Sequence, residues 1–203
     1  MKKIVLVLDA MGVIYQSADD VVELLAPFIK NRGGIADLAT VEKLYVRASL
    51  GELTATQFWD AVGIPSHLER EYLSQHRLTE GLQAFLANVP SSVGSIWCLS
   101  NDVSEWSHAL REKHGLARYF AGFIISGDVR SRKPIAAIYE ALLSELGLPA
   151  TDCVFVDDRI KNLNAAKELG FRTVLFAPGT SQDLEQSHPV VKSFDDLGHY
   201  LTV

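Results

Sequence analysis

The feature that most constrains the fold is a regular alternation of short aliphatic runs with helical segments in the C-terminal two thirds of the chain. Strands joined by helices of this length require right-handed crossovers, which build a mainly parallel sheet with helices on both faces. The expected strands are 95–99, 122–126, 153–156 and 173–176, and the expected helices are 79–89, 104–114, 134–146, 160–169 and 194–201. The sequence therefore predicts an α/β fold with a doubly wound parallel sheet.

The N-terminal third begins with one further strand and then departs from this alternation. Residues 2–9 (KKIVLVLD) are almost all aliphatic after two lysines, which is typical of a strand buried on both faces. Between about residues 18 and 77 the apolar spacing is helical and no strand is evident. We therefore expect a helical domain at residues 17–78, inserted after the first strand of a core domain formed by residues 1–16 and 79–203.

Charge and hydropathy exclude several classes of partner. The 203 residues carry a formal net charge of −6, so no basic surface is expected for nucleic acid or an anionic membrane. The longest apolar run near the start is too short to span a bilayer, and the N-terminus lacks the features of a secretion signal. We expect a cytoplasmic protein without a nucleic-acid or membrane partner, and the sequence does not indicate an oligomeric state.

Polar side chains follow four of the predicted strands, at the edge of the sheet where ligands bind in folds of this kind. Each one alone is commonly a helix cap or a turn former, but a set at the same end of successive strands indicates a functional site. The set comprises Asp9 after the first strand, Ser100 and Asn101 after the second, Lys133 in the loop after the third, and Asp157 with Asp158 after the fourth.

These residue types suit attack on a phosphoryl group. We predict that Asp9 is the nucleophile and forms a transient acyl phosphate. We predict that Lys133 is the second catalytic residue, because its charge offsets that of the nucleophile and of the phosphoryl group. Ser100 and Asn101, together with Lys133, are the expected ligands of the phosphate oxygens. The substrate is then expected to be a small phosphorylated metabolite.

An anionic nucleophile that approaches an anionic phosphate needs a counter-charge. Mg²⁺ bound by oxygen ligands supplies one, so we predict Mg²⁺ as the cofactor. Asp9 and Asp158 are its expected side-chain ligands. Asp157 and Asn162 are expected to support the metal site from behind these ligands.

The sequence resembles the haloacid dehalogenase superfamily of hydrolases (HAD superfamily) in four motifs that together cover most of the chain. They are LVLDAMGVIY (6–15), WCLSND (97–102), SRKP (131–134) and VFVDDRIKNLNAAKELG (154–170). The last motif and the segment RASLGELTATQFWDAVG (47–63) are similar to the epoxide-hydrolase-type branch, subfamily IA. The resemblance implies a Rossmann-like, HAD-type core with a helical C1 cap. It also implies hydrolysis of a small phosphate monoester or, occasionally, of a carbon–halogen bond.

Position 11 departs from the family pattern. The family's first motif is usually Asp-x-Asp, whereas this chain has Asp9-Ala10-Met11. In the family's phosphatases the second aspartate protonates the leaving oxygen and later activates water, a role worth roughly 10²–10⁴ in rate. The family takes only the backbone oxygen of this position as a metal ligand, so Met11 is still expected to bind Mg²⁺. Its side chain cannot transfer a proton.

Several residues in the predicted helical domain, and one at the hinge into it, are candidates for roles that this departure leaves open. Tyr15, His67 and His76 are possible proton donors, although packing or surface roles are commoner for such residues. Arg47 is a candidate clamp for a substrate carboxylate or a second phosphate, against the commoner role of a solvated arginine.

Two alternatives to a phosphatase stay open. A catalytically silent binding protein would explain Met11. Loss of activity would, however, also permit substitution of Asp9, Lys133 and Asp158, and all three are present. A 2-haloacid dehalogenase would explain Met11 too, because halide leaves without a proton. The 2-haloacid dehalogenases need no metal and usually lack the acidic pair of the last motif. The presence of Asp157 and Asp158 here therefore favours the phosphatase.

Overall fold

The computed structural model describes residues 3–179 and 187–202. Within this part of the chain the strands form one six-stranded sheet, all parallel, in the order β3-β2-β1-β4-β5-β6. The strands are β1 (Ile4–Leu8), β2 (Val93–Ser100), β3 (Gly122–Ile125), β4 (Cys153–Asp157), β5 (Arg172–Phe176) and β6 (Val190–Val191). The predicted doubly wound α/β fold is confirmed.

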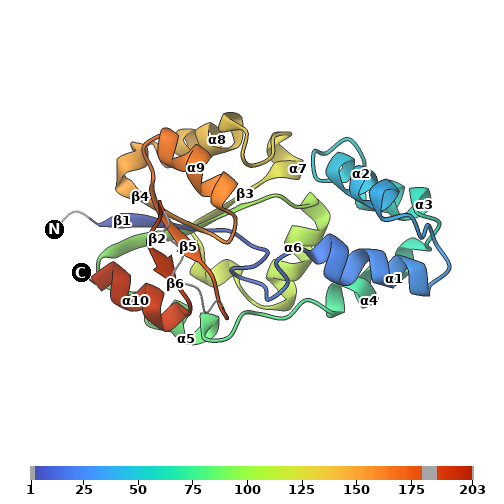
Figure 1. Cartoon of the computed structure of the whole chain (residues 1–203), viewed down its shortest axis with the longest axis horizontal. Coiled ribbons are helices and arrows are strands. Elements are labelled where there is room, and N and C mark those ends of the chain that lie inside the picture. The colour runs from blue at the N-terminus through green and yellow to red at the C-terminus, as the bar shows by residue number, and fades with distance from the viewer. Residues whose placement is uncertain (1–2, 180–186, 203) are drawn as a thin grey trace.

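Strand β1 lies in the middle of the sheet, and its composition explains why. Val5 and Val7 face one hydrophobic cluster, whereas Leu6 and Leu8 face the other. A strand needs aliphatic residues at every position when both faces of the sheet are covered. Helices cover one face with α8 (Ala136–Leu146) and α9 (Ile160–Glu168), and the other with α5 (Leu82–Ala87), α6 (Ser104–Lys113) and α10 (Phe194–Thr202) (Figure 1).

Between β1 and β2, the part of the chain that precedes α5 forms a helical lobe beside the sheet, at the right of Figure 1. None of the described strands lies between β1 and β2, which agrees with the predicted helical insertion. The limits of the insertion at residues 17 and 78 stay a prediction. Its helices are η1 (Val21–Leu25), α1 (Ala26–Asn31), α2 (Leu38–Ala48), α3 (Ala55–Ala61), η2 (Ser66–Leu68) and α4 (Glu69–Ser74).

Hydrogen bonds join this helical lobe to the core. Glu69 accepts from the indole N–H of Trp59 at 2.9 Å and from that of Trp106, in α6, at 2.8 Å. The Tyr45 hydroxyl of α2 donates to the backbone oxygen of Asn101 at 3.1 Å. The lobe therefore closes over the end of the sheet at which β2 ends.

Two short elements were not predicted from the sequence. They are α7 (Ser126–Val129), a single turn after β3, and β6, which has two residues. Neither is long enough to show a period in its apolar residues. Helix α5 begins at Leu82 and not at residue 79, because Gly81 just before it has a left-handed φ of 79°. Besides η2, the described 3₁₀ turns are η3 (Ala117–Tyr119) and η4 (Ala150–Asp152).

Some predictions concern residues that the structure does not describe, and the structure addresses the prediction about membranes only through its helices. Residue 2 of the predicted first strand and residues 180–186 and 203 of the predicted core domain lie outside the described residues. Among the described helices, none has the length and apolar composition needed to cross a membrane.

Candidate active site

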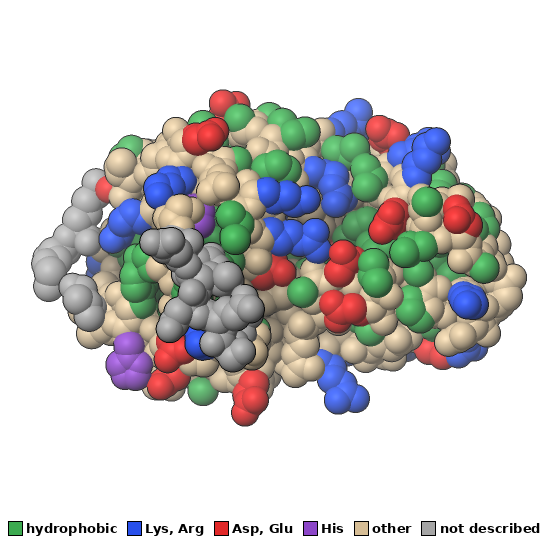
Figure 2. Space-filling model, viewed as in Figure 1, with side chains coloured by type: hydrophobic (Ala, Val, Ile, Leu, Met, Phe, Trp, Pro, Cys, Tyr) green, Lys and Arg blue, Asp and Glu red, His purple; other side chains and the backbone are tan. Residues whose placement is uncertain are grey.

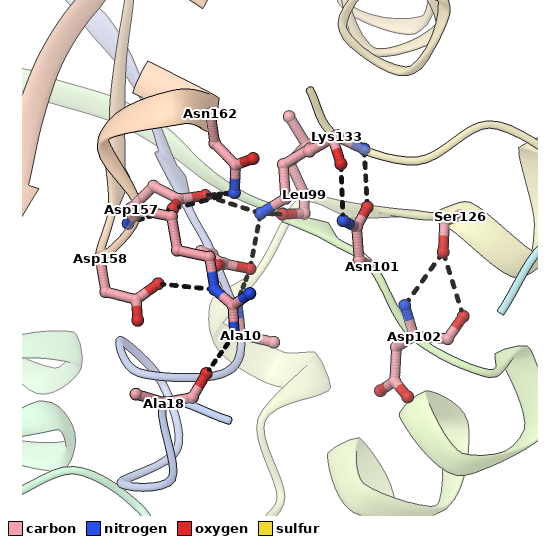
Figure 3. Close-up of polar contacts among 12 residues, drawn as sticks. Ala10, Ala18, Leu99, Asn101, Asp102, Ser126, Lys133, Asp157, Asp158 and Asn162 are labelled. Atoms are coloured by element: carbon pink, nitrogen blue, oxygen red, sulfur yellow. Dashed lines mark hydrogen bonds and ion pairs between the residues drawn. The ribbon is translucent and has the colours of Figure 1, made fainter. Parts of the chain in front are cut away.

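The sheet order explains how distant residues meet at one site. Strand β1 pairs with β2 on one side and with β4 on the other, so the three carboxyl ends lie together. Asp9 follows β1, Ser100 ends β2 and Asp157 ends β4. The structure thus brings the residues predicted from the strand ends to one edge of the sheet. Figure 3 shows four of them, Asn101, Lys133, Asp157 and Asp158.

Lys133 connects two of these strand ends. Its Nζ lies 2.7 Å from Asp9 Oδ1 and 2.8 Å from Asp157 Oδ2, and it also donates to the Leu99 backbone oxygen at 2.8 Å. Figure 3 shows the Lys133 side chain directed toward Asp157 and Leu99. Burial by itself lowers the pKa of Lys133, but Asp157 and Asp9 outweigh it and raise that pKa above its usual value. The ammonium therefore stays charged and compensates two buried carboxylates.

Asp157 is fixed from several sides. The Asn162 amide donates to its two carboxylate oxygens at 3.1 and 3.0 Å, and the backbone N–H of Arg159 donates to Oδ1 at 2.7 Å. Asp157 is fully buried, and a buried carboxylate needs such donors. These contacts hold the Asp157 carboxylate in one orientation beside Lys133.

Three carboxylates crowd together next to this lysine. Oxygen atoms of Asp9, Asp157 and Asp158 lie within 4.8 Å of one another. Burial, and then the charge of Asp157, raise the pKa of Asp9 well above its usual value, while Lys133 acts in the opposite direction. Burial and Asp157 also raise the pKa of Asp158 to about 6. The cluster holds more negative charge than Lys133 compensates, which suits the binding of a cation.

Several oxygen atoms at this cluster fit a hard divalent cation. Asp158 Oδ1 is buried and has no hydrogen-bond partner among the described residues, and its ion-pair contact with Arg159 Nε is long, at 4.0 Å. The Met11 backbone oxygen accepts none of the loop hydrogen bonds of the described residues. Carboxylate and carbonyl oxygens are the ligands that Mg²⁺ prefers. The residues present therefore fit the predicted metal.

Gly12 makes room for this arrangement. Its φ is 79°, and a Cβ atom at this position would lie 2.5 Å from Asp158 Oδ2. A left-handed backbone and a contact this close both favour glycine. The first motif is thereby folded tightly against the Asp158 carboxylate.

The second motif supplies polar groups on the other side of Asp9. Ser100 Oγ is buried and has no hydrogen-bond partner among the described residues. The Asn101 side chain is bonded to the Lys133 backbone, from Nδ2 to the oxygen at 3.0 Å and to Oδ1 from the N–H at 2.7 Å. Within the part of the chain that the structure describes, one amide hydrogen of Asn101 and the Ser100 hydroxyl are left for a ligand.

These groups line a pocket of about 320 Å³ between the core and the helical lobe. Figure 2 shows Lys, Arg, Asp and Glu side chains side by side near the middle of this face. Asp9, Met11, Ser100, Asn101, Lys133 and Asn162 line the pocket, as do Asp19, Asp20, Val21, Glu42, Tyr45, Val46, Arg132, Arg159 and Lys161. The Met11 side chain, 8% exposed, also belongs to the apolar core.

The residues considered as substitute proton donors do not line this pocket. Tyr15 is buried, with its ring centroid 6.1 Å from that of His76 and 5.9 Å from that of His114. His76 is buried beside it, and His67 is exposed on the helical lobe. The packing and surface roles considered for these residues are therefore the ones found.

Arg47 is not a clamp in this structure, because it pairs with the exposed Glu52 at 3.1 Å outside the pocket.

Arg132 lines the pocket, although the sequence analysis did not predict a role for it. Its guanidinium donates to Ser49 Oγ at the end of α2 and lies 5.5 Å from the Tyr45 ring centroid. The signal in the sequence was its position next to Lys133.

Comparisons with known proteins identify the family and the fold of this chain. A family profile described as a haloacid dehalogenase-like hydrolase matches residues 5–170. Flavin mononucleotide hydrolase 1 of Arabidopsis thaliana is 26% identical over 130 residues, which cover 64% of this chain and 49% of that protein. The matched part of the chain spans about half the length, or less, of the first curated relatives.

Solved structures show the same fold. A HAD family enzyme from Bacteroides thetaiotaomicron superposes with a TM-score of 0.72 at 18% identity, covering 91% of this chain and 97% of that chain. It has also been solved with magnesium and inorganic phosphate. L-2-haloacid dehalogenase from Xanthobacter autotrophicus gives a TM-score of 0.70 at 18% identity, covering 99% and 98%. At these identities the likeness establishes the fold and leaves the substrate open.

Proposed function

Because this chain belongs to the haloacid dehalogenase-like hydrolases, we propose that it hydrolyses a small phosphate monoester with Mg²⁺, through an aspartyl phosphate on Asp9. The observation that carries the proposal is the buried contact of Lys133 with Asp9 and Asp157, next to an Asp158 oxygen that has no hydrogen-bond partner among the described residues and lies 4.0 Å from Arg159 Nε. This arrangement suits an anionic nucleophile that must approach an anionic substrate.

The protein's own groups divide the work as follows. An oxygen of Asp9 attacks phosphorus, and the bond from phosphorus to the ester oxygen breaks. Lys133 offsets the charge on Asp9 and on the phosphoryl oxygens. The Ser100 hydroxyl and the remaining amide hydrogen of Asn101 donate to phosphoryl oxygens. Water then attacks the aspartyl phosphate and releases inorganic phosphate.

Three groups would hold the metal, namely the carboxylates of Asp9 and Asp158 and the backbone oxygen of Met11. When bound, Mg²⁺ supplies positive charge that offsets the repulsion between nucleophile and phosphate. Asp157 and Asn162 support the site through the hydrogen bonds that fix the Asp157 carboxylate. The HAD family enzyme that was solved with magnesium and phosphate supports this choice of metal.

The leaving group must do without the usual aspartate at position 11. Of the carboxyl groups lining the pocket, only Asp9 belongs to the first motif. We therefore propose that esters with good leaving groups, such as aryl or acyl phosphates, react much faster than alkyl phosphates. A leaving oxygen that is already a weak base gains little from a proton donor.

The dehalogenase alternative is disfavoured by Asp158. A reaction without a metal has no use for a buried carboxylate oxygen that has no hydrogen-bond partner among the described residues and lies in a cluster of like charges. The same observation weighs against a silent binding protein. We further propose that residues 17–78 act as a C1-type cap over the site, that the substrate is a small phosphorylated metabolite, and that the enzyme works in the cytoplasm.

Steady-state hydrolysis of p-nitrophenyl phosphate tests the proposal, with Mg²⁺ and with a chelator. Wild type is expected to be active only with Mg²⁺, and Asp9→Asn to lose activity by about 10⁴-fold or more. Asp60→Asn, an exposed carboxylate in α3 of the helical lobe, is the matched control and keeps its activity. Equal rates for wild type and Asp9→Asn would overturn the proposal.

A further inference from the structure

Asp20 is a buried carboxylate in the wall of the pocket, on the side formed by the helical lobe. Its side chain is 7% exposed, and the residue lines the pocket together with Asp9 and Tyr45. Oδ2 accepts from the Tyr72 hydroxyl at 3.3 Å. Oδ1 accepts none of the hydrogen bonds among the described residues. One oxygen of a nearly buried carboxylate is therefore left for a ligand in the pocket.

The usual reason for an aspartate at the start of a helix does not apply to Asp20. It stands at the N-cap position of η1, but its side chain makes no capping hydrogen bond. Its neighbour Asp19 does this instead, because Asp19 Oδ1 accepts from the Val22 N–H at 3.2 Å, and Glu23 Oε1 accepts from the Asp19 N–H at 2.9 Å. Asp20 is thus not required to cap this helix.

Asp20 also lacks a strong cationic partner. Within the described residues, its one ion-pair contact is with His76 Nε2 at 3.9 Å, and no lysine or arginine lies within 4.0 Å. A second buried carboxyl, Asp102, lies nearby. Burial is the main cause that raises the pKa of Asp102, and the charge of Asp20 is the next. Buried carboxylates are normally paired, because leaving one without a cation is costly. A cation that enters the pocket would relieve this cost.

The charges around the pocket are divided between its two sides. The basic residues come from the core, whereas the acidic residues other than Asp9 come from the helical lobe. Arg159 pairs across the two sides with Asp19 at 3.5 Å, and Asp20 has no such partner among the described residues. The basic residues are Arg132, Lys133, Arg159 and Lys161, and the acidic residues are Asp19, Asp20 and Glu42. A ligand with a phosphate at one end and a positive charge at the other would match this division.

We infer that the preferred substrate carries a protonated amine on its leaving group and that Asp20 binds this ammonium. The inference rests on the proposed function, because it takes the phosphoryl group to be held next to Asp9. Asp20 then selects the substrate by a charge-assisted hydrogen bond from its free oxygen, while the core residues hold the phosphate.

Calorimetric titration of two phosphonates tests this inference, because their carbon–phosphorus bond resists hydrolysis. 2-Aminoethylphosphonate and propylphosphonate have chains of equal length and differ in the charge at the end. With Mg²⁺ present, wild type is expected to bind the aminoethyl compound about 10- to 100-fold more tightly. Asp20→Asn keeps the shape of the side chain and removes the charge, so it is expected to lose this difference.

The matched control is Asp19→Asn, which removes a neighbouring carboxylate that lines the same side of the pocket. This variant is expected to keep the preference for the amine. Equal binding of the two phosphonates by wild type would overturn the inference, whether or not the variants fold. A preference that persists in Asp20→Asn would overturn it as well. If neither phosphonate binds, the proposed function fails together with the inference.

Discussion

Gly12 and Asp158 approach each other so closely that position 12 has no room for a side chain. A Cβ atom on Gly12 would lie 2.5 Å from Asp158 Oδ2 and 2.6 Å from its Cγ, and the backbone of Gly12 is left-handed. The first and last motifs of the chain are therefore fitted to each other at the proposed metal site. A substitution at Gly12 should affect metal binding although glycine itself offers no side-chain ligand.

Gly12→Ala is expected to displace the Asp158 carboxylate and to lower Mg²⁺ affinity by about 10- to 100-fold. It is also expected to destabilise the fold by about 1–2 kcal/mol, because alanine is strained at this φ. Gly33→Ala is the matched control, since Gly33 has a φ of 81° but a Cβ atom there would meet nothing within 4 Å. Similar Mg²⁺ affinities for the two variants by calorimetry would contradict this prediction.

Lys133→Met is expected to lower the free energy of unfolding by about 3–5 kcal/mol, because it leaves Asp9 and Asp157 buried without their shared cation. Urea denaturation at neutral pH measures the effect. Adding Asp157→Asn to this variant removes one of the two uncompensated charges, so the double variant should be more stable than Lys133→Met. A loss below about 1 kcal/mol in the single variant would show that Lys133 does not carry this charge balance.

The binding of Mg²⁺ is expected to weaken as the pH falls through about 6, where the Asp158 carboxyl takes up a proton in the metal-free protein. Protons compete with the metal for the same oxygen, so below this pH the affinity should fall up to about tenfold per unit through Asp158 alone. The raised pKa of Asp9 acts in the same direction. Calorimetric titrations between about pH 5 and 8 measure it, and an affinity that does not change over this range would contradict the prediction.

Without metal, Asp158 is expected to make the fold less stable as the pH rises. Its pKa is raised to about 6 in the folded protein, against about 3.9 for an unfolded chain. Between these values the folded state holds a proton that the unfolded state has released, so stability falls as the pH increases. Asp158→Asn should therefore raise the thermal midpoint of the metal-free protein at pH 7 and abolish its stabilisation by Mg²⁺. A lower midpoint for this variant without metal would contradict the prediction.

Met11→Asp is expected to restore the missing proton donor and to raise the rate on alkyl phosphates by roughly 10²–10⁴-fold. The rate on p-nitrophenyl phosphate should change far less, because that leaving group needs little help from a proton. Met11→Leu serves as the control, since it keeps an apolar side chain at this position. If a folded Met11→Asp variant shows no gain on alkyl esters, the pocket supplies the proton in another way.

Much of the fold could be predicted because its signals are local. The aliphatic run of β1 and the alternation of strands and helices after residue 92 follow from side chains that must be buried on both faces of a sheet. The segments α7 and β6 could not be predicted in this way. A single turn and a two-residue strand depend on contacts with distant segments, which leave no periodic pattern of their own.

The candidate site could likewise be predicted in part from local sequence and in part only from the tertiary structure. The order of amino acids alone establishes which residues stand at the strand ends, because most of them directly follow an aliphatic run. It also establishes that position 11 has no acidic side chain. The packing of the folded chain was needed to establish that Lys133 bridges Asp9 and Asp157, that Arg132 and not Arg47 reaches the pocket, and that Asp20 is buried without a strong cation. The physical reason is that pairing and burial depend on how the helical lobe and the sheet pack together, whereas a strand end is set by the residues on either side of it.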